Sequence, residues 1–142
     1  MLKLLVPIDG SQHSDRAVDY AIQRARQARD GACVELLNVQ LPMTGVNVKM
    51  FISQENLESY YRDEAMTVLQ PALHRLREAG IPVEHHIGVG DPGRVTVDYA
   101  IGKQIDEIII GSRGRGVLSG ALLGSVAQKV IHLSPVPVVV IT

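Results

Sequence analysis

The residues best placed to do chemistry form one glycine-rich segment in the carboxyl-terminal third of the chain. From Gly111 to Ser125 it reads GSRGRGVLSGALLGS, with five glycines in its first fourteen positions, two arginines and no acidic residue. Glycine lets the backbone approach a ligand without interference from a Cβ atom. Successive N–H groups in such a loop can surround an anion, and the start of a following helix adds partial positive charge. The segment therefore predicts a polyphosphate-binding loop; the alternative is a flexible linker with no ligand.

Two better-known phosphate-binding motifs fit the sequence less well. A Walker loop needs Gly-Lys followed by Ser or Thr, and the Gly-Lys pair that begins at Gly102 is followed by glutamine. A dinucleotide-binding G-x-G-x-x-G occurs from Gly88 to Gly93, but it follows the third predicted strand, and the next strand ends without an acid to hold a ribose. We interpret this motif as a tight turn that leads into a helix capped by Asp91.

Five short apolar runs rich in β-branched residues predict strands, and helical spacing fills the segments between them. The runs at 108–110 and 138–141 are continuous, which is typical of strands buried on both faces. The order βαβαβαβαβ predicts an α/β fold, an open and mostly parallel five-stranded sheet with helices on both faces, similar to the Rossmann arrangement. The predicted strands are Leu2–Ile8, Cys33–Val39, Pro82–Ile87, Glu107–Ile110 and Pro137–Ile141.

Start and stop signals delimit the predicted helices. The second helix spans Ser53–Ala79 and stops at Gly80, which suits the left-handed position after a helix. Asp91 followed by proline begins the third helix. Ser125 with Gln128 three residues later forms a capping box that begins the fourth. A flexible linker would not end in this way, so the capping box favours the phosphate-loop interpretation.

Length and composition predict one domain spanning residues 1–142, with Leu41–Ile52 as a surface loop or lid. The chain is 46% hydrophobic and 20% charged with a formal net charge of −1, so no basic field draws it to nucleic acid or a membrane surface. The 4% aromatic content argues against a binder of single-stranded nucleic acid, which needs rings for stacking. The single cysteine, Cys33, excludes an intrachain disulfide, and no apolar run is long enough for a signal peptide or a membrane span. We therefore expect a cytoplasmic protein with neither nucleic acid nor membrane as a partner.

The spacing Gly111-x2-Gly114-x9-Gly124-Ser125 resembles the nucleotide-binding signature of the universal stress protein family. The resemblance extends to VPIDGS at 6–11 and to PVPVVV at 135–140, so together with the order of elements it spans essentially the whole chain. Members with this loop bind ATP, and the resemblance implies an ATP-binding member.

Matched positions imply a site at the carboxyl ends of the strands. Asp9 would lie beside the ribose or adenine, although Asp-Gly-Ser after a strand is also ordinary turn chemistry. Backbone groups of Val39 would meet the adenine edge, and Arg113 would reach a phosphate or face water. The residues implied to line the nucleotide are Pro7, Asp9, Val39, Gly111, Arg113, Gly114, Gly124, Ser125 and Val126.

The resemblance implies a stress-response sensor or regulator that binds ATP, with slow hydrolysis at most. Mg²⁺ accompanies ATP in some members, and without a dedicated ligand cluster here it would be held mainly by phosphates and water. Dedicated phosphoryl transfer needs a positioned base, charge neutralisers and a metal, and only part of that set is visible.

Two alternatives and one expected partner complete the sequence-based predictions. The first alternative is an ATP pyrophosphatase or adenylyl-transferring enzyme, although DGSQ at 9–12 does not match the Ser-Gly-Gly-x-Asp-Ser type of loop that such enzymes carry. The second is a dimeric interaction module that binds no nucleotide. A last strand at 137–141 would, at the sheet edge, invite pairing with another copy. The family resemblance likewise implies a homodimer joined through this strand.

Overall fold

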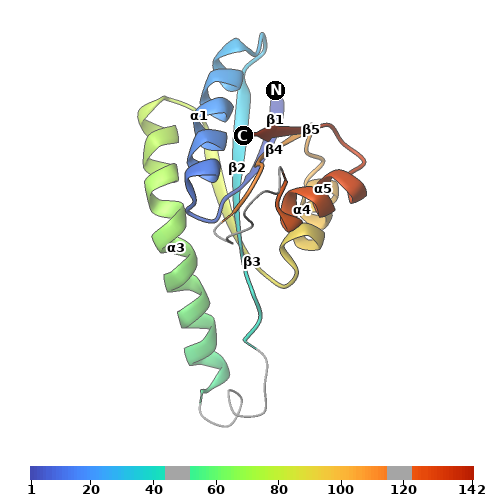
Figure 1. Cartoon of the computed structure of the whole chain (residues 1–142). Helices are drawn as coiled ribbons and strands as arrows, with labels where there is room; N and C mark the ends of the chain where they lie inside the picture. The colour runs from blue at the N-terminus through green and yellow to red at the C-terminus, as the bar shows by residue number, and fades with distance from the viewer. Residues whose placement is uncertain (44–51, 115–122) are drawn as a thin grey trace.

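The computed structural model describes residues 1–43, 52–114 and 123–142, in which strands and helices alternate (Figure 1). The bounds of all five predicted strands are confirmed to within two residues. Most of the predicted loop Leu41–Ile52 lies outside the described residues. In chain order the elements are β1 (Leu2–Pro7), α1 (Gln12–Gln27), β2 (Ala32–Gln40), α3 (Gln54–Glu78), β3 (Val83–Val89), α4 (Pro92–Gly102), β4 (Glu107–Gly111), α5 (Ser125–Leu133) and β5 (Val138–Ile141).

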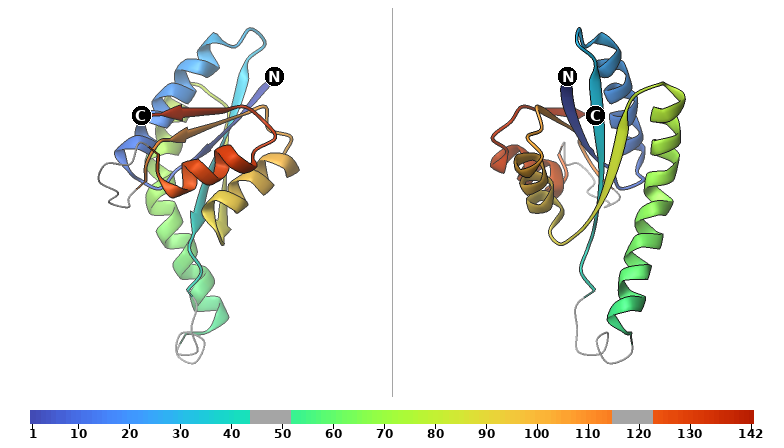
Figure 2. Two further views of the ribbon diagram at one scale, coloured as in Figure 1. Left: turned by 45° about the vertical axis from the view of Figure 1, so that its right-hand side comes forward. Right: turned by 180° about the vertical axis from the view of Figure 1, so that it is seen from behind.

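The described strands form a parallel sheet in the order β3-β2-β1-β4-β5. Helices α1 and α3 cover one face of the sheet, and α4 and α5 cover the other (Figure 2). The α/β prediction is therefore confirmed. Because the chain proceeds from β1 toward β3 on one side and then crosses to β4 on the other, the strand order reverses between β1 and β4. Open α/β sheets bind ligands at the carboxyl ends of the strands that flank such a reversal.

Side chains alternate between the two helical layers along each strand. Leu4 packs in the layer of α1 and α3, whereas Leu5 packs in the layer of α4 and α5. Ile108 and Ile109 are both fully buried, which confirms the burial predicted for both faces of β4. The same prediction for 138–141 is wrong, because all four residues of β5 are only half-buried. Among the described strands, β5 lies at the sheet edge and pairs only with β4.

The predicted bounds of α3 and the predicted start of α4 are confirmed by their caps. The side chain of Ser53 accepts a hydrogen bond from an N–H in the first turn of α3, and Gly80 after its end has φ of +74°. Asp91 caps α4 by accepting from the N–H of Arg94 at 3.0 Å. None of the helices in the described part of the chain is both long and apolar enough to cross a membrane.

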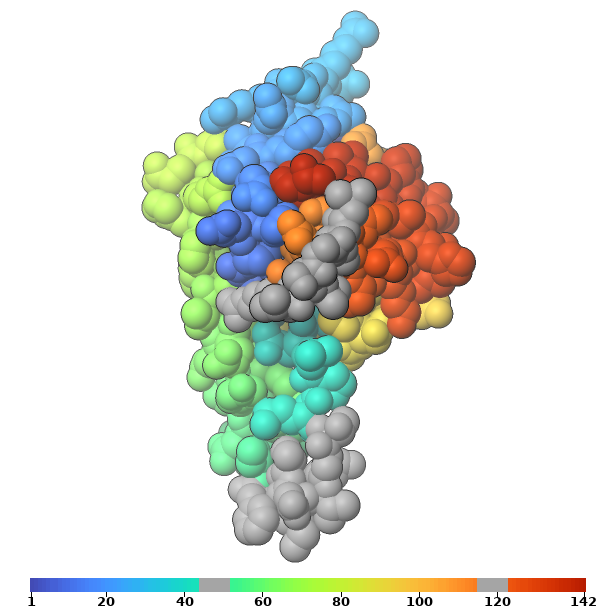
Figure 3. Space-filling model, viewed as in Figure 1, coloured from blue at the N-terminus to red at the C-terminus, as the bar shows by residue number. Residues whose placement is uncertain are grey.

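The end of β5 is tied to α1. Arg16 of α1 donates from Nε to the carbonyl oxygen of Thr142 at 2.9 Å. Figure 3 shows the β5 residues adjoining α1 on this face of the molecule. The end of β5 is therefore fixed to the neighbouring helix, while one of its long edges pairs with no other strand among the described residues.

A buried acid joins β2 to α4. Glu35 is 8% exposed and accepts a hydrogen bond from the hydroxyl of Tyr99 at 2.9 Å. The Tyr99 ring also lies against His86 of β3, with ring centroids 4.9 Å apart. Burial, followed by the interaction with Glu35, raises the pKa of Tyr99 above its ordinary value.

This raised pKa predicts a loss of stability in alkali. The unfolded chain loses the Tyr99 proton near pH 10 while the folded chain retains it, so the stabilisation is complete below about pH 10 and falls as the pH rises further. We expect Tyr99→Phe to reduce the slope of the free energy of unfolding against pH above that point, measured by urea denaturation. Tyr60→Phe, at an exposed tyrosine, should keep the native slope. Equal slopes for both variants would contradict the assignment to Tyr99.

Candidate functional site

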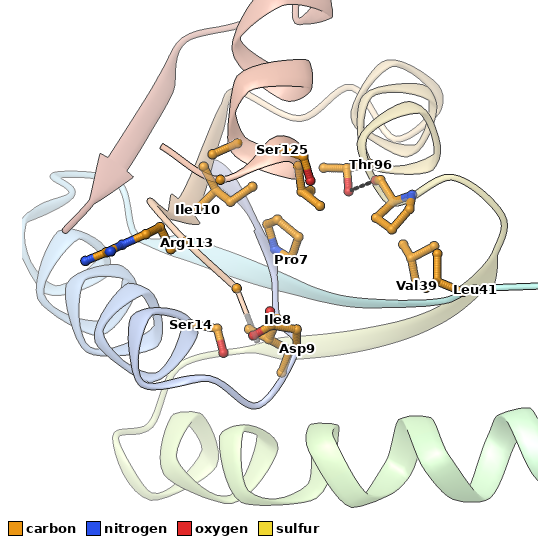
Figure 4. A pocket seen from close by; sticks show the side chains of 16 residues that line it. Pro7, Ile8, Asp9, Ser14, Val39, Leu41, Thr96, Ile110, Arg113 and Ser125 are labelled. Atoms are coloured by element: carbon orange, nitrogen blue, oxygen red, sulfur yellow. Dashed lines mark hydrogen bonds between the residues drawn. The ribbon is translucent and has the colours of Figure 1, made fainter. Parts of the chain in front are cut away.

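A cavity of about 270 Å³ opens at the carboxyl ends of β1, β2 and β4, between the sheet and the starts of α4 and α5 (Figure 4). Residues from distant parts of the chain meet there because the parallel strands end at one edge of the sheet. All nine of the residues implied by the family resemblance line this cavity: Pro7, Asp9, Val39, Gly111, Arg113, Gly114, Gly124, Ser125 and Val126.

Strand alternation explains which strand residues face the cavity. Leu5 and Leu37 pack in the layer of α4 and α5. Pro7 and Val39 follow them by two residues, so they face the same side of the sheet. Ile110 follows Ile108 in the same way and also lines the cavity. Ile110 was not predicted as a site residue, although the alternation of side chains along β4 would have indicated that it faces the cavity.

The remaining lining residues were not predicted either, because they depend on how helices pack. Thr96 is fully buried at the cavity wall, and its hydroxyl donates to the carbonyl oxygen of Pro92 at 2.7 Å. Leu41, which is 68% exposed, forms part of the wall beyond the end of β2. No local sequence signal marks these positions. The other residues missed are Ile8, Ser14, Pro92 and Ala127.

Two short backbone hydrogen bonds fix the ends of the glycine-rich segment. The N–H of Ser112 donates to the carbonyl oxygen of Ile141 in β5, and the N–H of Gly124 donates to the carbonyl oxygen of Ser112, both at 2.7 Å. The chain therefore leaves the sheet and returns to the same point before α5 begins. The interior of the segment, from 115 to 122 and including Arg115, lies outside the described residues.

The start of α5 differs from the predicted capping box. Gly124 is the N-cap residue and provides no side-chain hydrogen bond, while Ser125 is already the first helical residue. Gln128 donates from Nε2 to the carbonyl oxygen of Leu123 at 2.9 Å. The capping-box prediction is therefore wrong. The first N–H groups of a helix have no acceptor within it, so this end of α5 presents hydrogen-bond donors and partial positive charge beside the cavity.

Asp9 organises the turn between β1 and α1. Its Oδ1 accepts from the N–H of Ser11 at 2.9 Å, and Gly10 between them has φ of +83°. The side chain of Ser11 then caps α1 by accepting from the N–H of Ser14 at 3.1 Å. The turn chemistry expected of Asp-Gly-Ser is confirmed. Asp9 also lines the cavity, so its carboxylate belongs both to the turn and to the cavity wall.

The glycines of the signature are explained first by the packing of the protein itself. A Cβ atom at Gly111 would lie 2.8 Å from the backbone carbon of His13, so glycine lets α1 approach the end of β4. At Gly114 it would collide with Oδ2 of Asp9. At Gly124 it would lie 3.3 Å from the Cα of Arg113. Glycine at 111 is therefore needed whether or not a ligand is bound, whereas a side chain at 114 or 124 would require the Asp9 carboxylate or the backbone at Arg113 to shift.

The two helices that cover the cavity are joined by an ion pair. Lys129 of α5 lies 2.9 Å from Oδ2 of Asp91, the cap of α4, and lowers the pKa of that carboxyl group. Gly93 permits this approach, because a Cβ there would be 2.8 Å from the Cβ of Lys129.

Arg113 is exposed, and its side chain points away from the labelled cavity residues Pro7 and Ser125 (Figure 4). Among the described residues, no three histidine, cysteine or acidic side chains gather as metal ligands.

Comparison with known proteins identifies the family of this chain. The model of the universal stress protein family matches residues 1–142. The chain therefore belongs to the universal stress protein family. Universal stress protein YxiE of Bacillus subtilis is 28% identical over 98% of this chain and 97% of its own length. The structure of MJ0577 of Methanocaldococcus jannaschii is 31% identical and matches with a TM-score of 0.85, covering 99% of this chain and 94% of that one.

Structural neighbours include nucleotide-bound forms. A universal stress protein of Archaeoglobus fulgidus, solved in complex with dAMP, is 26% identical with a TM-score of 0.69. The match covers 100% of this chain and 98% of that protein. The family and the fold are thus shared with a protein that was solved with an adenine nucleotide.

Gly111→Ala tests the packing explanation of the signature. We expect it to lower the free energy of unfolding by about 1–3 kcal/mol, because the start of α1 must move away from β4. Gly102→Ala is the matched control, since a Cβ at the end of α4 meets nothing within 4 Å. The control should leave stability unchanged or slightly higher, because alanine is the better helix former. Urea denaturation measures both; a Gly111→Ala variant as stable as the native protein would contradict this explanation.

Proposed function

We propose that this protein binds ATP in the cavity between β1, β4 and α5 and acts as a cytoplasmic stress-response sensor or regulator. One observation carries the proposal: the uncapped start of α5 lies beside a cavity whose opposite wall carries Asp9 and Val39. Backbone N–H groups and a helix dipole suit phosphate oxygens. A carboxylate and a nearby strand end suit a ribose and an adenine edge.

The size and lining of the cavity divide the nucleotide between two regions. About 270 Å³ is close to the lower end of the range of about 300–1,000 Å³ typical of ligand pockets. The base and ribose would occupy this volume against the apolar residues Val39, Leu41 and Pro92. The phosphates would lie at the start of α5, where Gly124 provides no side-chain cap for the first backbone N–H groups. Any Mg²⁺ would be coordinated mainly by the phosphates and water.

Binding and regulation account for the site better than dedicated catalysis. Asp9 is already engaged by the N–H of Ser11, and Arg113 points away from the cavity. Phosphoryl transfer needs a positioned base together with charge neutralisation. An ATP pyrophosphatase or adenylyl-transferring enzyme would release AMP and pyrophosphate, whereas an interaction module would bind no nucleotide.

Identification of the bound nucleotide tests the proposal directly. Native protein is purified, denatured, and the released small molecules are identified by mass spectrometry; calorimetry then compares ATP with adenosine. We expect ATP to be recovered or to bind more tightly than adenosine, with little turnover. No binding of any adenine nucleotide would favour the interaction module, and rapid release of AMP and pyrophosphate would favour the enzyme.

A negative charge introduced at the start of α5 should weaken phosphate binding without destabilising the fold. Ser125→Glu should weaken ATP binding by about tenfold or more, because a carboxylate beside the phosphates repels them. The same acid in the first turn of a helix is favoured by the dipole, worth about 0.3–1 kcal/mol, so the fold should be retained. Ser125→Gln is a control of similar size, and adenosine binding should be unchanged in both variants. Equal losses for ATP and adenosine would place the phosphates elsewhere.

We propose further that β5 joins two copies into a homodimer. Its four residues are apolar and half-buried, whereas the other edge strand, β3, carries exposed Glu84, His85 and His86, which discourage strand pairing. Sedimentation velocity at micromolar concentration should therefore show a dimer. Val140→Lys on β5 should give monomers, while the matched Val83→Lys on β3 should not. A native monomer would contradict the proposed dimer.

A further inference from the structure

A buried amide lies behind the proposed base end of the cavity, in a layer that is mostly apolar. Asn38 of β2 is 3% exposed. It follows Val34 and Leu36 by alternation, so its side chain faces α1 and α3. Burying an amide in such a layer is costly unless it is hydrogen-bonded. Leucine has the same branched shape and would fill the position without that cost, so packing alone does not call for asparagine.

The hydrogen bonds of Asn38 connect the ends of three strands. Its Nδ2 donates to the carbonyl oxygen of Ile8 at 2.8 Å, beyond the end of β1. Its Oδ1 accepts from Nε2 of Gln40 at 2.6 Å, which fixes the orientation of the amide. The carbonyl oxygen of Gln40 in turn accepts from the N–H of Gly90 at 2.9 Å, just after β3. The chain of bonds thus runs from β3 through β2 to the turn after β1.

This chain of bonds holds the backbone beside two residues that line the cavity, Ile8 and Val39. Ile8 precedes Asp9, and its own N–H donates to the carbonyl oxygen of Leu37 at 2.8 Å, so its peptide groups are held on both sides. Val39 lies between Asn38 and Gln40 and faces the cavity. The amide therefore fixes the backbone from which the Asp9 carboxylate projects.

We propose that Asn38, oriented by Gln40, is a positioning residue of the nucleotide site that acts through Asp9. This inference rests on the proposed function, because Asp9 must contact the nucleotide for its position to matter. Asn38 touches neither base nor phosphate. It holds the Ile8–Asp9 peptide in the geometry that places the carboxylate at the cavity wall.

A double-mutant cycle measured by ATP calorimetry tests the proposal. Asn38→Leu should weaken ATP binding by about tenfold, which is the scale of one buried hydrogen bond. With Asp9→Ala already present, Asn38→Leu should cause no further loss of affinity, although it should lower the free energy of unfolding equally in both backgrounds. If Asn38 has only a structural role, Asn38→Leu should lower the free energy of unfolding and leave ATP affinity unchanged. Alternatively, it should weaken ATP binding equally with and without Asp9→Ala.

Two further variants keep the test decisive if Asn38→Leu folds poorly. Gln40→Leu leaves the bond from Asn38 to Ile8 possible but removes its orienting partner, so a smaller loss of affinity that also disappears with Asp9→Ala is expected. Glu35→Leu is the control: it removes a buried hydrogen bond from the same strand, on the face toward Tyr99 and away from the Ile8–Asp9 turn. It should lower stability without changing ATP affinity.

The outcomes separate this inference from the function on which it rests. If native protein binds ATP and the Asn38 and Gln40 variants bind equally well, the positioning role is overturned and the proposed function survives. Equal losses with and without Asp9 also overturn the positioning role. If native protein binds no adenine nucleotide, both proposals fall together.

Discussion

The first turn of α5 leaves backbone N–H groups that no carbonyl within the helix can accept, and it leaves them beside the cavity at the reversal of strand order. Most helices cover such groups with the side chain of Ser, Thr, Asp or Asn at the N-cap. Gly124 has none to offer. The hydrogen bond from its N–H to Ser112 fixes where the helix begins. The rest of the site is arranged around this fixed set of donors.

That arrangement changes what the glycine signature means physically. Sequence reasoning attributes the glycines to close approach of a ligand, but in this fold Gly111 is required by α1 and Gly114 by Asp9. The same lack of a side chain leaves Gly124 without a capping group for the start of α5. Packing of the protein and binding of a ligand both favour glycine at these positions. The sequence motif alone therefore cannot tell which of the two accounts for a given glycine.

The nine residues that line the cavity were predicted from the resemblance to the universal stress protein family, whereas the strands and the α/β class were recovered because each depends on local pattern. The Asp91–Pro92 start and the Gly80 stop are confirmed for the same reason. The capping box failed because Ser125 and Gly124 are adjacent residues that can both serve as N-caps, and only the bond from Gly124 to Ser112 decides between them. Thr96, Asn38 and the half-exposed edge of β5 depend on which elements become neighbours, and no local pattern contains that information.

The most direct test of the central claim is a crystal structure of the native protein with Mg·ATP. The account predicts phosphate oxygens within hydrogen-bond distance of the backbone N–H groups at the start of α5, with the base beside Val39 and the ribose near Asp9. A nucleotide found elsewhere on the molecule, or a cavity that stays empty at saturating ATP, would contradict it.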